Sequence, residues 1–507
     1  MNNTMMNNKH MDNIVVITQN VKLESLSKLT GFVKPNSETL VVSTQLIFEN
    51  EAELINLILG SKCTYLNFSD LMTDAEEEQC DIDAFNPKTQ GQDVLRYYSD
   101  IKRCKNERII EKLHSIYPAK HKYIVCDDLG IDAESWLNAG YQKIEAEYYY
   151  KEADYSSNAG QNSQGVKVLN KVKKFIRTLA NIKKSRIYVG YDGRQKYLFF
   201  GKMHRIAYRL SIQFKEASFI EKVRYTLDKR GVNTQPATIR LATIHEGYHT
   251  LPDRADLNYH IVQDGYMPPD YGSNYLYFYG HNTRYYTWDV EGLKMFKKFN
   301  LPCEVLPIRK KLYLPQPTFP NKIKKVLCVA SGAGDWTAIK NRSDEDKMVV
   351  AFGKIASMFP DVEFVYRCHP VWISPSYQGV NSINRVIEYF EWLHLGNIHV
   401  SSNIPTGGLS NVSFQRSSLE EDLKNADIVF GEHSISMIDA ALDGILFCSV
   451  NVTGRRDLFR GISEMGFPHC ESVDEIATFI KGVGSEPMKK KYLSAVEKYN
   501  EMTDLEQ

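Results

Sequence analysis

Short apolar runs alternate with longer amphipathic segments along the first 150 residues of the chain. The apolar runs predict strands at 13–18, 39–42, 63–68 and 122–126. The segments between them place apolar residues at helical spacing and predict helices at 51–59, 92–116 and 133–139. Strands that alternate with helices are typical of a parallel α/β sheet.

The last third of the chain shows the same alternation with shorter connections. The predicted strands are 325–330, 363–367, 397–400, 427–430 and 446–450, and the predicted helices are 344–358, 418–425 and 435–442. A regular succession of this kind is typical of a doubly wound sheet.

The middle of the chain is less regular. Residues 151–165 are polar and rich in Gly, Ser and Asn, which predicts a loop. Residues 166–182 predict a helix with one apolar face and a basic remainder. This helix either docks on a core with its basic face in water, or contacts an anionic membrane surface or a phosphate-bearing acceptor. Residues 186–315 are rich in Tyr, and four prolines follow between 307 and 320.

A chain of 507 residues is too long for one core and suits two or three domains. The predicted fold class is α/β, with two Rossmann-like doubly wound domains facing a central cleft. The predicted divisions are a disordered N-terminus at 1–12, an N-terminal Rossmann-like domain with insertions at 13–306, a proline-rich linker at 307–321, a C-terminal Rossmann-like domain at 322–485, and a helical tail at 486–507.

Charge and cysteine usage exclude several classes of protein. The 62 basic and 62 acidic residues balance, so no bulk basic field attracts nucleic acid. The nine cysteines form no CxxC pair and several lie in apolar runs, which predicts reduced core residues in a cytoplasmic protein. Neither a signal peptide nor an apolar run long enough to span a membrane is recognisable. Peripheral contact with the inner membrane stays open through the basic segment 166–182.

Small, polar and basic residues follow the predicted strands of the C-terminal domain. Ligands of open α/β sheets bind outside the carboxyl ends of the strands, so these residues are candidates for binding a donor phosphate. The candidates are Gly332, Gly334, Lys340, Arg342, Arg367, Ser402, Asn403, Glu432, His433, Ser434 and Ser436.

The stretch GEHSISMIDAALDG at 431–444 carries the clearest candidate. It predicts a strand end, a polar turn and a helix that starts near Ser434. Ser434 and Ser436 either hold an anion at the helix start, or Ser434 only caps the helix.

Two further groups in this domain have alternative interpretations. The stretch SGAGDW at 331–336 lacks both a Walker A lysine and a full GxGxxG, so it predicts a close-approach glycine turn. Lys340 and Arg342 either reach a phosphate or lie in an exposed basic loop. His369 precedes a proline at a strand end, where we favour contact with a phosphate over a structural role.

The acidic candidates lie in the first half of the chain. Asp264 follows an apolar run and precedes a glycine, so it is either a general base or nucleophile, or a turn residue. Asp127 and Asp128 are interpreted as a turn or helix-capping pair. The HEGYH stretch at 245–249 is not a zinc-protease motif, and no metal site is predicted.

Three motifs occur in a recognisable order: QDG at 263–265, HP at 369–370 and HSIS at 433–436. Over roughly 240–455 this order resembles the bacterial sialyltransferase and Kdo-transferase families of GT-B type. Those families carry an acidic residue before the Asp-Gly pair, whereas this chain has Gln263, and a retaining variant with Asp264 as nucleophile is therefore conceivable.

The resemblance implies a glycosyltransferase with catalytic residues Asp264 and His369. It implies a CMP-activated keto-acid sugar as donor, a bacterial surface glycan or glycolipid as acceptor, and no metal or other cofactor. The alternatives are a GT-B transferase with a UDP-sugar, GDP-sugar or CDP-glycerol donor, and a non-catalytic nucleotide-binding or scaffold protein. The sequence does not identify the linkage, the anomeric outcome or the oligomeric state.

Overall fold

The computed structural model describes most of both ends of the 507-residue chain and a few strands of its middle. The described residues are 10–18, 23–84, 94–125, 131–145, 229, 231, 237–242, 258–263, 283–287, 303–305, 314–331, 342–369, 379–402, 414–432, 434–454 and 460–504. The predicted basic helix at 166–182 lies outside them, so its membrane contact stays a prediction.

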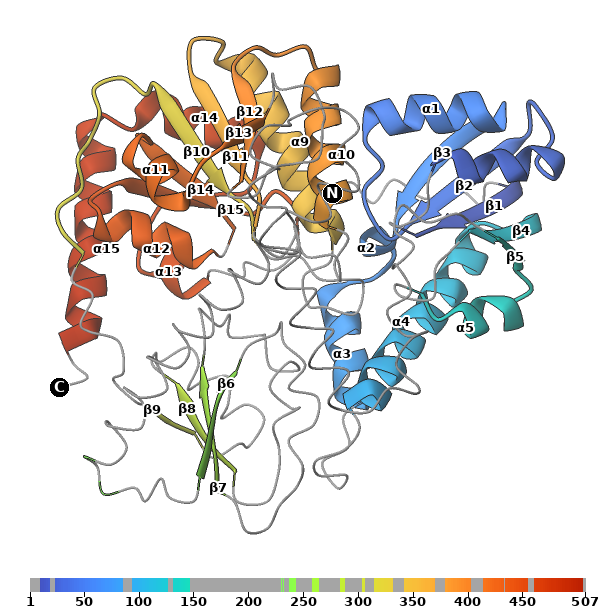
Figure 1. The fold of residues 1–507 in the computed structure, drawn as a ribbon, viewed down its shortest axis with the longest axis horizontal. Helices are drawn as coiled ribbons and strands as arrows, with labels where there is room; N and C mark the ends of the chain where they lie inside the picture. The colour runs from blue at the N-terminus through green and yellow to red at the C-terminus, as the bar shows by residue number, and fades with distance from the viewer. Residues whose placement is uncertain are drawn as a thin grey trace, which may run out of the picture.

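The N-terminal part of the chain forms a doubly wound parallel sheet (Figure 1). Its strands in the described part are β1 Met11–Ile17, β2 Glu38–Ser43, β3 Lys62–Asn67, β4 Ala119–Val125 and β5 Gln142–Ile144. They lie in the order β3-β2-β1-β4-β5, and every pairing is parallel. From β1 the chain therefore adds β2 and β3 on one side, and then adds β4 and β5 on the other side of β1.

The helical elements of this part are η1 Leu23–Gly31, α1 Glu49–Leu59, α2 Phe68–Leu71, α3 Asp74–Ala84, α4 Val94–Ile116 and α5 Ala133–Asn138. Strand β1 begins at Met11, two residues before the predicted start and inside the segment predicted to be disordered. Met11 is fully buried and pairs with Ala119, so apolar burial and strand pairing extend the element.

The C-terminal part forms a second doubly wound parallel sheet. Its strands within the described ranges are β10 Lys325–Val329, β11 Glu363–Arg367, β12 Ile398–Ser402, β13 Phe414–Arg416, β14 Ile428–Gly431, β15 Leu446–Val450 and β16 His469–Cys470. The order β13-β12-β11-β10-β14-β15-β16 again reverses at the first strand. The prediction of two Rossmann-like doubly wound sheets is therefore confirmed.

The helices that connect or follow these strands cover the second sheet. They are α9 Arg342–Met358, α10 Gly379–Trp392, α11 Leu419–Lys424, α12 Ile435–Leu442, α13 Arg460–Glu464, α14 Val473–Gly482 and α15 Glu486–Asp504. The long helix α15 is fastened to the domain at two points. The buried Tyr492 hydroxyl accepts a hydrogen bond from Phe447 N at 3.0 Å, and the Asn500 side chain bonds both backbone polar groups of Leu314.

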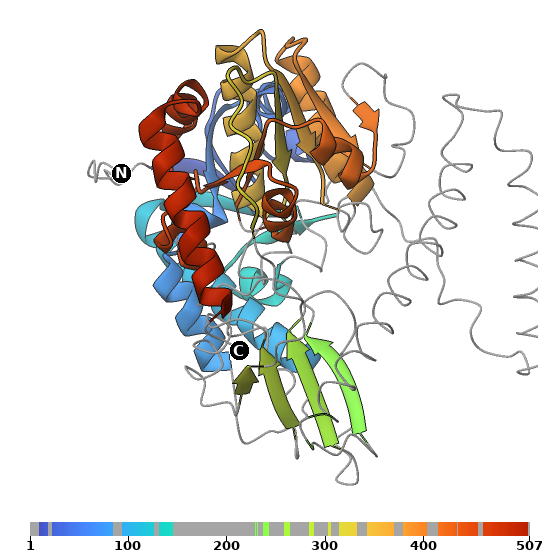
Figure 2. The same cartoon turned by 90° about the vertical axis from the view of Figure 1, so that its left-hand side faces the viewer.

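A third, smaller sheet comes from the Tyr-rich middle of the chain. The described strands β6 Ala237–Ala242, β7 Asn258–Gln263, β8 Thr283–Thr287 and β9 Cys303–Val305 pair in sequence order, all parallel. Figures 1 and 2 show this sheet apart from the two doubly wound sheets. The range 13–306, predicted as one domain, thus contains two separate sheets.

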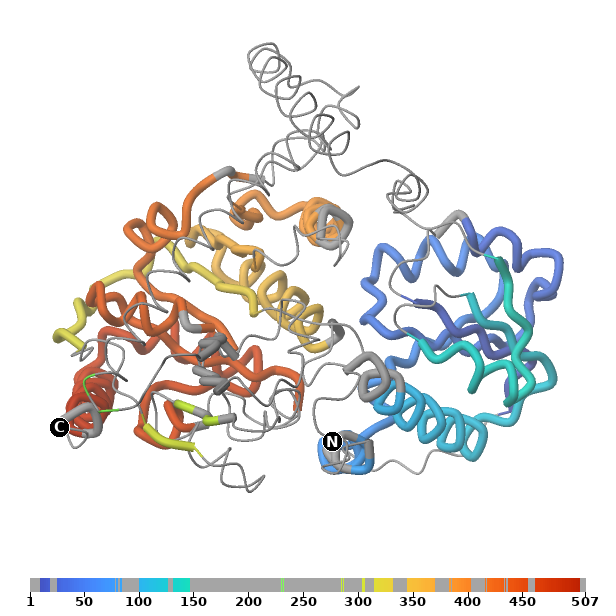
Figure 3. The backbone as a smooth tube through the Cα atoms, turned by 60° about the horizontal axis from the view of Figure 1, so that its bottom comes forward, coloured from blue at the N-terminus to red at the C-terminus, as the bar shows by residue number. Residues whose placement is uncertain are grey.

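The two doubly wound domains lie side by side and share a contact (Figure 3). Phe48 of the β2–α1 connection is fully buried in the hydrophobic core of the C-terminal domain and stacks on Tyr389 of α10, with ring centroids 4.5 Å apart. The Arg385 guanidinium lies 3.9 Å from the Phe48 ring centre and bonds Glu51 of α1 and Asp346 of α9.

These contacts join segments that follow the carboxyl ends of strands in both domains. The β2–α1 connection follows β2, α9 follows β10, and α10 follows β11. A second contact also joins segments that follow strand ends. Lys347 of α9 lies 3.4 Å from the carboxylate of Asp70, and Asp70 belongs to α2, the helix that follows β3. The carboxyl edges of the two sheets therefore face the same interdomain boundary.

Replacing Arg385 with Leu is expected to destabilise the protein by about 3–5 kcal/mol, because it leaves the Glu51 and Asp346 carboxylates buried without their cation. Their side chains are 12% and 0% exposed. Calorimetric unfolding measures the change. Lys424→Ala is the matched control: it breaks an exposed ion pair with Glu420 and should change stability by less than about 0.5 kcal/mol. Equal effects of the two substitutions would contradict the account.

Candidate functional site

The carboxyl ends of the second sheet form one row. Strand register aligns Val329 of β10 with Arg367 of β11 and Gly431 of β14, and these in turn with Ser401 of β12 and Ser449 of β15. Backbone hydrogen bonds continue past the row, from Ala330 N to Arg367 O at 2.9 Å and from Cys368 N to Ser401 O at 3.1 Å.

The residues beyond this row are the predicted candidates. His369 follows β11 and is half-buried, Ser402 ends β12 and is buried, and Glu432 follows β14 and is buried. Ser434 and Ser436 stand at the start of α12 and are half-buried. The structure therefore brings these five residues to one edge of the sheet, and their role in binding a phosphate stays a prediction.

Several predicted residues cannot be placed. Asp264, Gly332, Gly334, Lys340, Asn403 and His433 lie outside the described residues, and only the backbone of Arg342 is described, as the first residue of α9. The roles of these residues stay predictions. The same holds for Asp127 and Asp128, and for the HEGYH stretch.

The position of Asp264 in the chain is nevertheless informative. It directly follows Gln263, the last residue of β7. Strand β7 belongs to the four-stranded sheet, so this carboxylate comes from the middle of the chain and not from the N-terminal doubly wound sheet.

The approach of β14 to β10 requires a glycine at the row. A Cβ atom on Gly431 would lie 2.9 Å from Val329 Cγ2, 3.0 Å from Met437 Sδ and 3.1 Å from Val329 O. One of those atoms is backbone and the other two belong to buried side chains. Gly431 thus allows the central strands and the first turn of α12 to pack together.

The start of α12 shows a conventional helix cap. The Ser434 hydroxyl accepts a hydrogen bond from Ser436 N at 3.3 Å, and Ser434 has extended backbone angles. The capping role considered for Ser434 is therefore present. A phosphate contact at this helix start stays a prediction.

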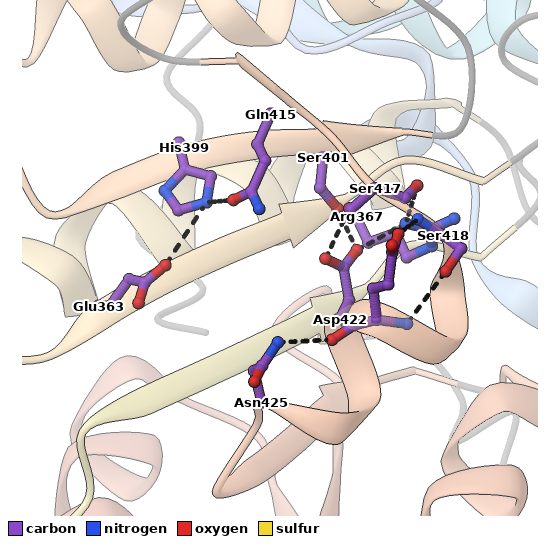
Figure 4. Close-up of polar contacts among 10 residues, drawn as sticks. Glu363, Arg367, His399, Ser401, Gln415, Ser417, Ser418, Asp422 and Asn425 are labelled. Atoms are coloured by element: carbon purple, nitrogen blue, oxygen red, sulfur yellow. Dashed lines mark hydrogen bonds and ion pairs between the residues drawn. The ribbon is translucent and has the colours of Figure 1, made fainter.

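Arg367 enters a buried polar cluster (Figure 4). Its Nη1 donates to Asp422 Oδ2 of α11 at 2.6 Å and to Ser417 O at 3.2 Å. Asp422 also accepts from the hydroxyls of Ser401 and Ser417, both at 2.6 Å. Arg367 and Asp422 are 6% and 2% exposed, so the pair joins β11, β12 and α11 inside the domain. Contact of Arg367 with a donor phosphate stays a prediction, and the observed contacts are structural.

Sequence reasoning missed Asp422 and Ser417. A local signal existed, because Ser418 and Glu421 form a capping box that starts α11 and fixes the position of Asp422. The partner of Asp422 lies 55 positions away in the chain and could not be inferred from that signal.

Two other buried groups at this edge were also missed. Glu345 of α9 accepts from Ser331 N at 3.2 Å and from the Tyr366 hydroxyl at 2.9 Å, which holds the residue after β10 against α9. After β15, the Asn451 side chain accepts from both the backbone and the hydroxyl of Thr453. Both groups shape the loops that border the row.

A polar cluster around His399 lies toward the opposite edge of the sheet, where the strands begin. His399 Nε2 is 2.8 Å from Gln415 Oε1 and 3.7 Å from Glu363 Oε1 (Figure 4). Glu363 is the first residue of β11, which places the cluster away from the carboxyl row. Burial lowers the pKa of His399 below its ordinary value. His399 is therefore not a candidate site residue.

Within the described part of the chain, no group of three or more His, Cys, Asp or Glu side chains is placed to hold a metal ion. Among the same residues, no helix combines the length and the apolar character that crossing a bilayer requires.

Comparisons with known proteins show only limited structural similarity. No family model and no curated protein matches the sequence. Among solved structures, the chain is similar to TarM from S. aureus, whose structure was described in complex with UDP, at 10% identity and a TM-score of 0.28. That match covers 50% of this chain and 52% of TarM, so the chain spans about half of its length.

Two further solved structures are matched over almost the whole length of both chains. One is described as trehalose-6-phosphate from E. coli bound with UDP-2-fluoro glucose, at 9% identity, 97% and 95% coverage and a TM-score of 0.29. The other is UDP-GlcNAc 2-epimerase from Neisseria meningitidis, at 8% identity, 98% and 100% coverage and a TM-score of 0.21. At these TM-scores the likeness assigns no substrate, and the fold class stands on the strand order described above.

Replacing Gly431 with Ala is expected to destabilise the protein by about 1–3 kcal/mol, because the added methyl would lie too close to the buried Val329 side chain and to the Val329 carbonyl oxygen. Urea unfolding measures the loss. Gly482→Ala is the matched control: it adds a methyl at the end of α14 with no atom within 4 Å, and should leave stability equal or slightly higher. A tolerated Gly431→Ala would show that β10, β14 and α12 pack less closely than described.

Proposed function

We propose that this chain is a glycosyltransferase of GT-B type that moves a CMP-activated keto-acid sugar onto a bacterial surface glycan or glycolipid. The observation that supports it most is the convergence of His369, Ser402, Glu432, Ser434 and Ser436 on one carboxyl edge of a doubly wound sheet. Described residues of two of the three family-like motifs stand at this edge, namely His369 of HP and Ser434 and Ser436 of HSIS.

The position of the edge also supports the proposal. In open α/β sheets, ligands bind where the strand order reverses. The reversal lies at β10, between β11 and β14, and these two strands carry His369 and the α12 start at their ends. The phosphate of the departing nucleotide would lie between them.

In the proposed reaction, an acceptor hydroxyl oxygen bonds to the anomeric carbon of the donor sugar while the bond from that carbon to the phosphate oxygen breaks. The hydroxyl proton passes to Asp264, and CMP leaves with the electron pair. In a retaining variant Asp264 would first bond to the anomeric carbon itself. His369 and the hydroxyls at the α12 start would stabilise the negative charge on the phosphate.

The leaving group carries a single phosphate, which fixed protein donors can meet without a metal ion. The carboxylate comes from the β7 end and the phosphate donors from the C-terminal sheet. The proposal therefore requires the four-stranded sheet to present Asp264 to the interdomain boundary.

The proposal predicts that CMP raises the melting temperature of the protein while UDP and GDP do not. A ligand at a hundred times its dissociation constant stabilises the folded state by about 2.7 kcal/mol. His369→Ala should abolish the shift, because the phosphate loses its contact. The control His394→Asn changes an exposed histidine just before β12, at the opposite edge, where the left-handed backbone suits Asn. It should leave the shift intact.

Turnover separates binding from chemistry in the same experiment. Release of CMP from CMP-sialic acid or CMP-Kdo should disappear in Asp264→Asn, while the thermal shift with CMP persists. If only UDP, GDP or CDP raises the melting temperature, the proposed CMP-sugar donor is wrong and the assignment as a transferase stands. No shift with any nucleotide would favour a non-catalytic protein.

A further inference from the structure

Two cysteines of the N-terminal domain meet between neighbouring helices. Cys80 of α3 and Cys104 of α4 have their sulfur atoms 2.6 Å apart, although 24 positions separate them in the chain. This distance is shorter than an ordinary contact between sulfur atoms, and about half an ångström longer than a disulfide bond. The helices thus hold the two thiols in reach of each other.

Ion pairs between α3 and α4 fasten the two helices together. Lys112 of α4 pairs with Glu76 of α3 at 2.5 Å, and Arg108 pairs with Asp83 at 3.2 Å. Hydrogen bonding with Cys80 and the positive charge of Arg108 together lower the pKa of the Cys104 thiol to about 7, against the opposing effect of burial. The lowered pKa favours the thiolate of Cys104, which is the reactive form of cysteine.

Exposure distinguishes the roles of the two sulfurs. Cys104 is half-buried, whereas Cys80 is fully buried. A second pair, Cys448 and Cys470, lies 3.5 Å apart but is buried in the C-terminal sheet, where burial raises the pKa of Cys448 well above its ordinary value. That pair lacks both access and thiolate character.

We propose that Cys80 and Cys104 form a reversible disulfide when the protein meets a peroxide, and that this bond fixes α3 on α4. The proposal concerns the N-terminal domain and is independent of the proposed transferase activity.

The chemistry balances with hydrogen peroxide as the two-electron oxidant. The Cys104 thiolate attacks one peroxide oxygen, the O–O bond breaks, and Cys104 becomes a sulfenic acid while hydroxide leaves. The Cys80 sulfur then bonds to the Cys104 sulfur and displaces its oxygen as water. Two thiols and one peroxide thus give one disulfide and two waters.

The bond would act close to the interdomain contact. Helix α3 begins three residues after the end of α2, and Asp70 of α2 meets Lys347 of α9. A bridge that closes a 24-residue separation restricts the unfolded chain and should hold this region more firmly. Backbone amides of α3 should then exchange more slowly with solvent.

The test exposes the purified full chain to equimolar hydrogen peroxide, blocks remaining thiols with iodoacetamide and maps peptides by mass spectrometry without reductant. The expected result is a peptide that links Cys80 to Cys104, reversed by dithiothreitol, while Cys448 and Cys470 remain alkylated. Oxidation should raise the melting temperature of the transition that contains residues 10–145 by roughly 5 °C. Hydrogen exchange of α3 should slow in parallel.

Two variants complete the test. Cys104→Ser should abolish the linked peptide. If the serine variant does not fold, Cys104→Ala is used in its place. Cys63→Ser, which changes another half-buried cysteine of the same domain, should leave the linked peptide unchanged. The proposal is overturned if wild-type Cys104 is recovered as a sulfinic acid, joined to another cysteine, or unmodified while other thiols react.

Discussion

A parallel sheet brings the carboxyl ends of all its strands to one edge, and the candidate site depends on this constraint. The inner strands β10, β11 and β14 are buried on both faces, so polar side chains are tolerated mainly at their ends. Register then aligns those ends across the sheet, from Ser401 to Ser449. Gly431 permits the close approach at the centre of the row, where the strand order reverses.

Buried charged groups connect the strands of this sheet to a neighbouring helix and connect the two domains to each other. The pair of Arg367 and Asp422 ties β11 and β12 to α11 at the carboxyl row. Arg385 does the same between domains, since it binds carboxylates of α1 and α9 and packs on Phe48. Buried ions demand close partners, so such pairs specify one packing arrangement even where an apolar replacement could be equally stable.

Many of the regular elements could be predicted because apolar runs and helical periodicity are local. The predicted strand at 325–330 and helix at 344–358 match β10 and α9 to within two residues. The convergence of His369, Ser402 and Ser434 also followed from one rule, that loops after parallel strands share an edge.

What the sequence did not reveal depends on contacts between distant residues. Asp422 and Arg367, Phe48 and Tyr389, and Cys80 and Cys104 each meet across long separations, and no local pattern marks them. The strands β6 to β9 were missed for another reason, because they lie in a long stretch without the regular succession of apolar runs and amphipathic segments seen at both ends of the chain.

The most direct test of the central claim is a crystal structure of the protein with CMP bound. The account predicts that the nucleotide lies at the carboxyl edge of the C-terminal sheet beside β10 and β14. Its phosphate should be within hydrogen-bonding distance of His369 and of the Ser434–Ser436 helix start. A nucleotide bound elsewhere, or a phosphate that contacts neither group, would contradict it.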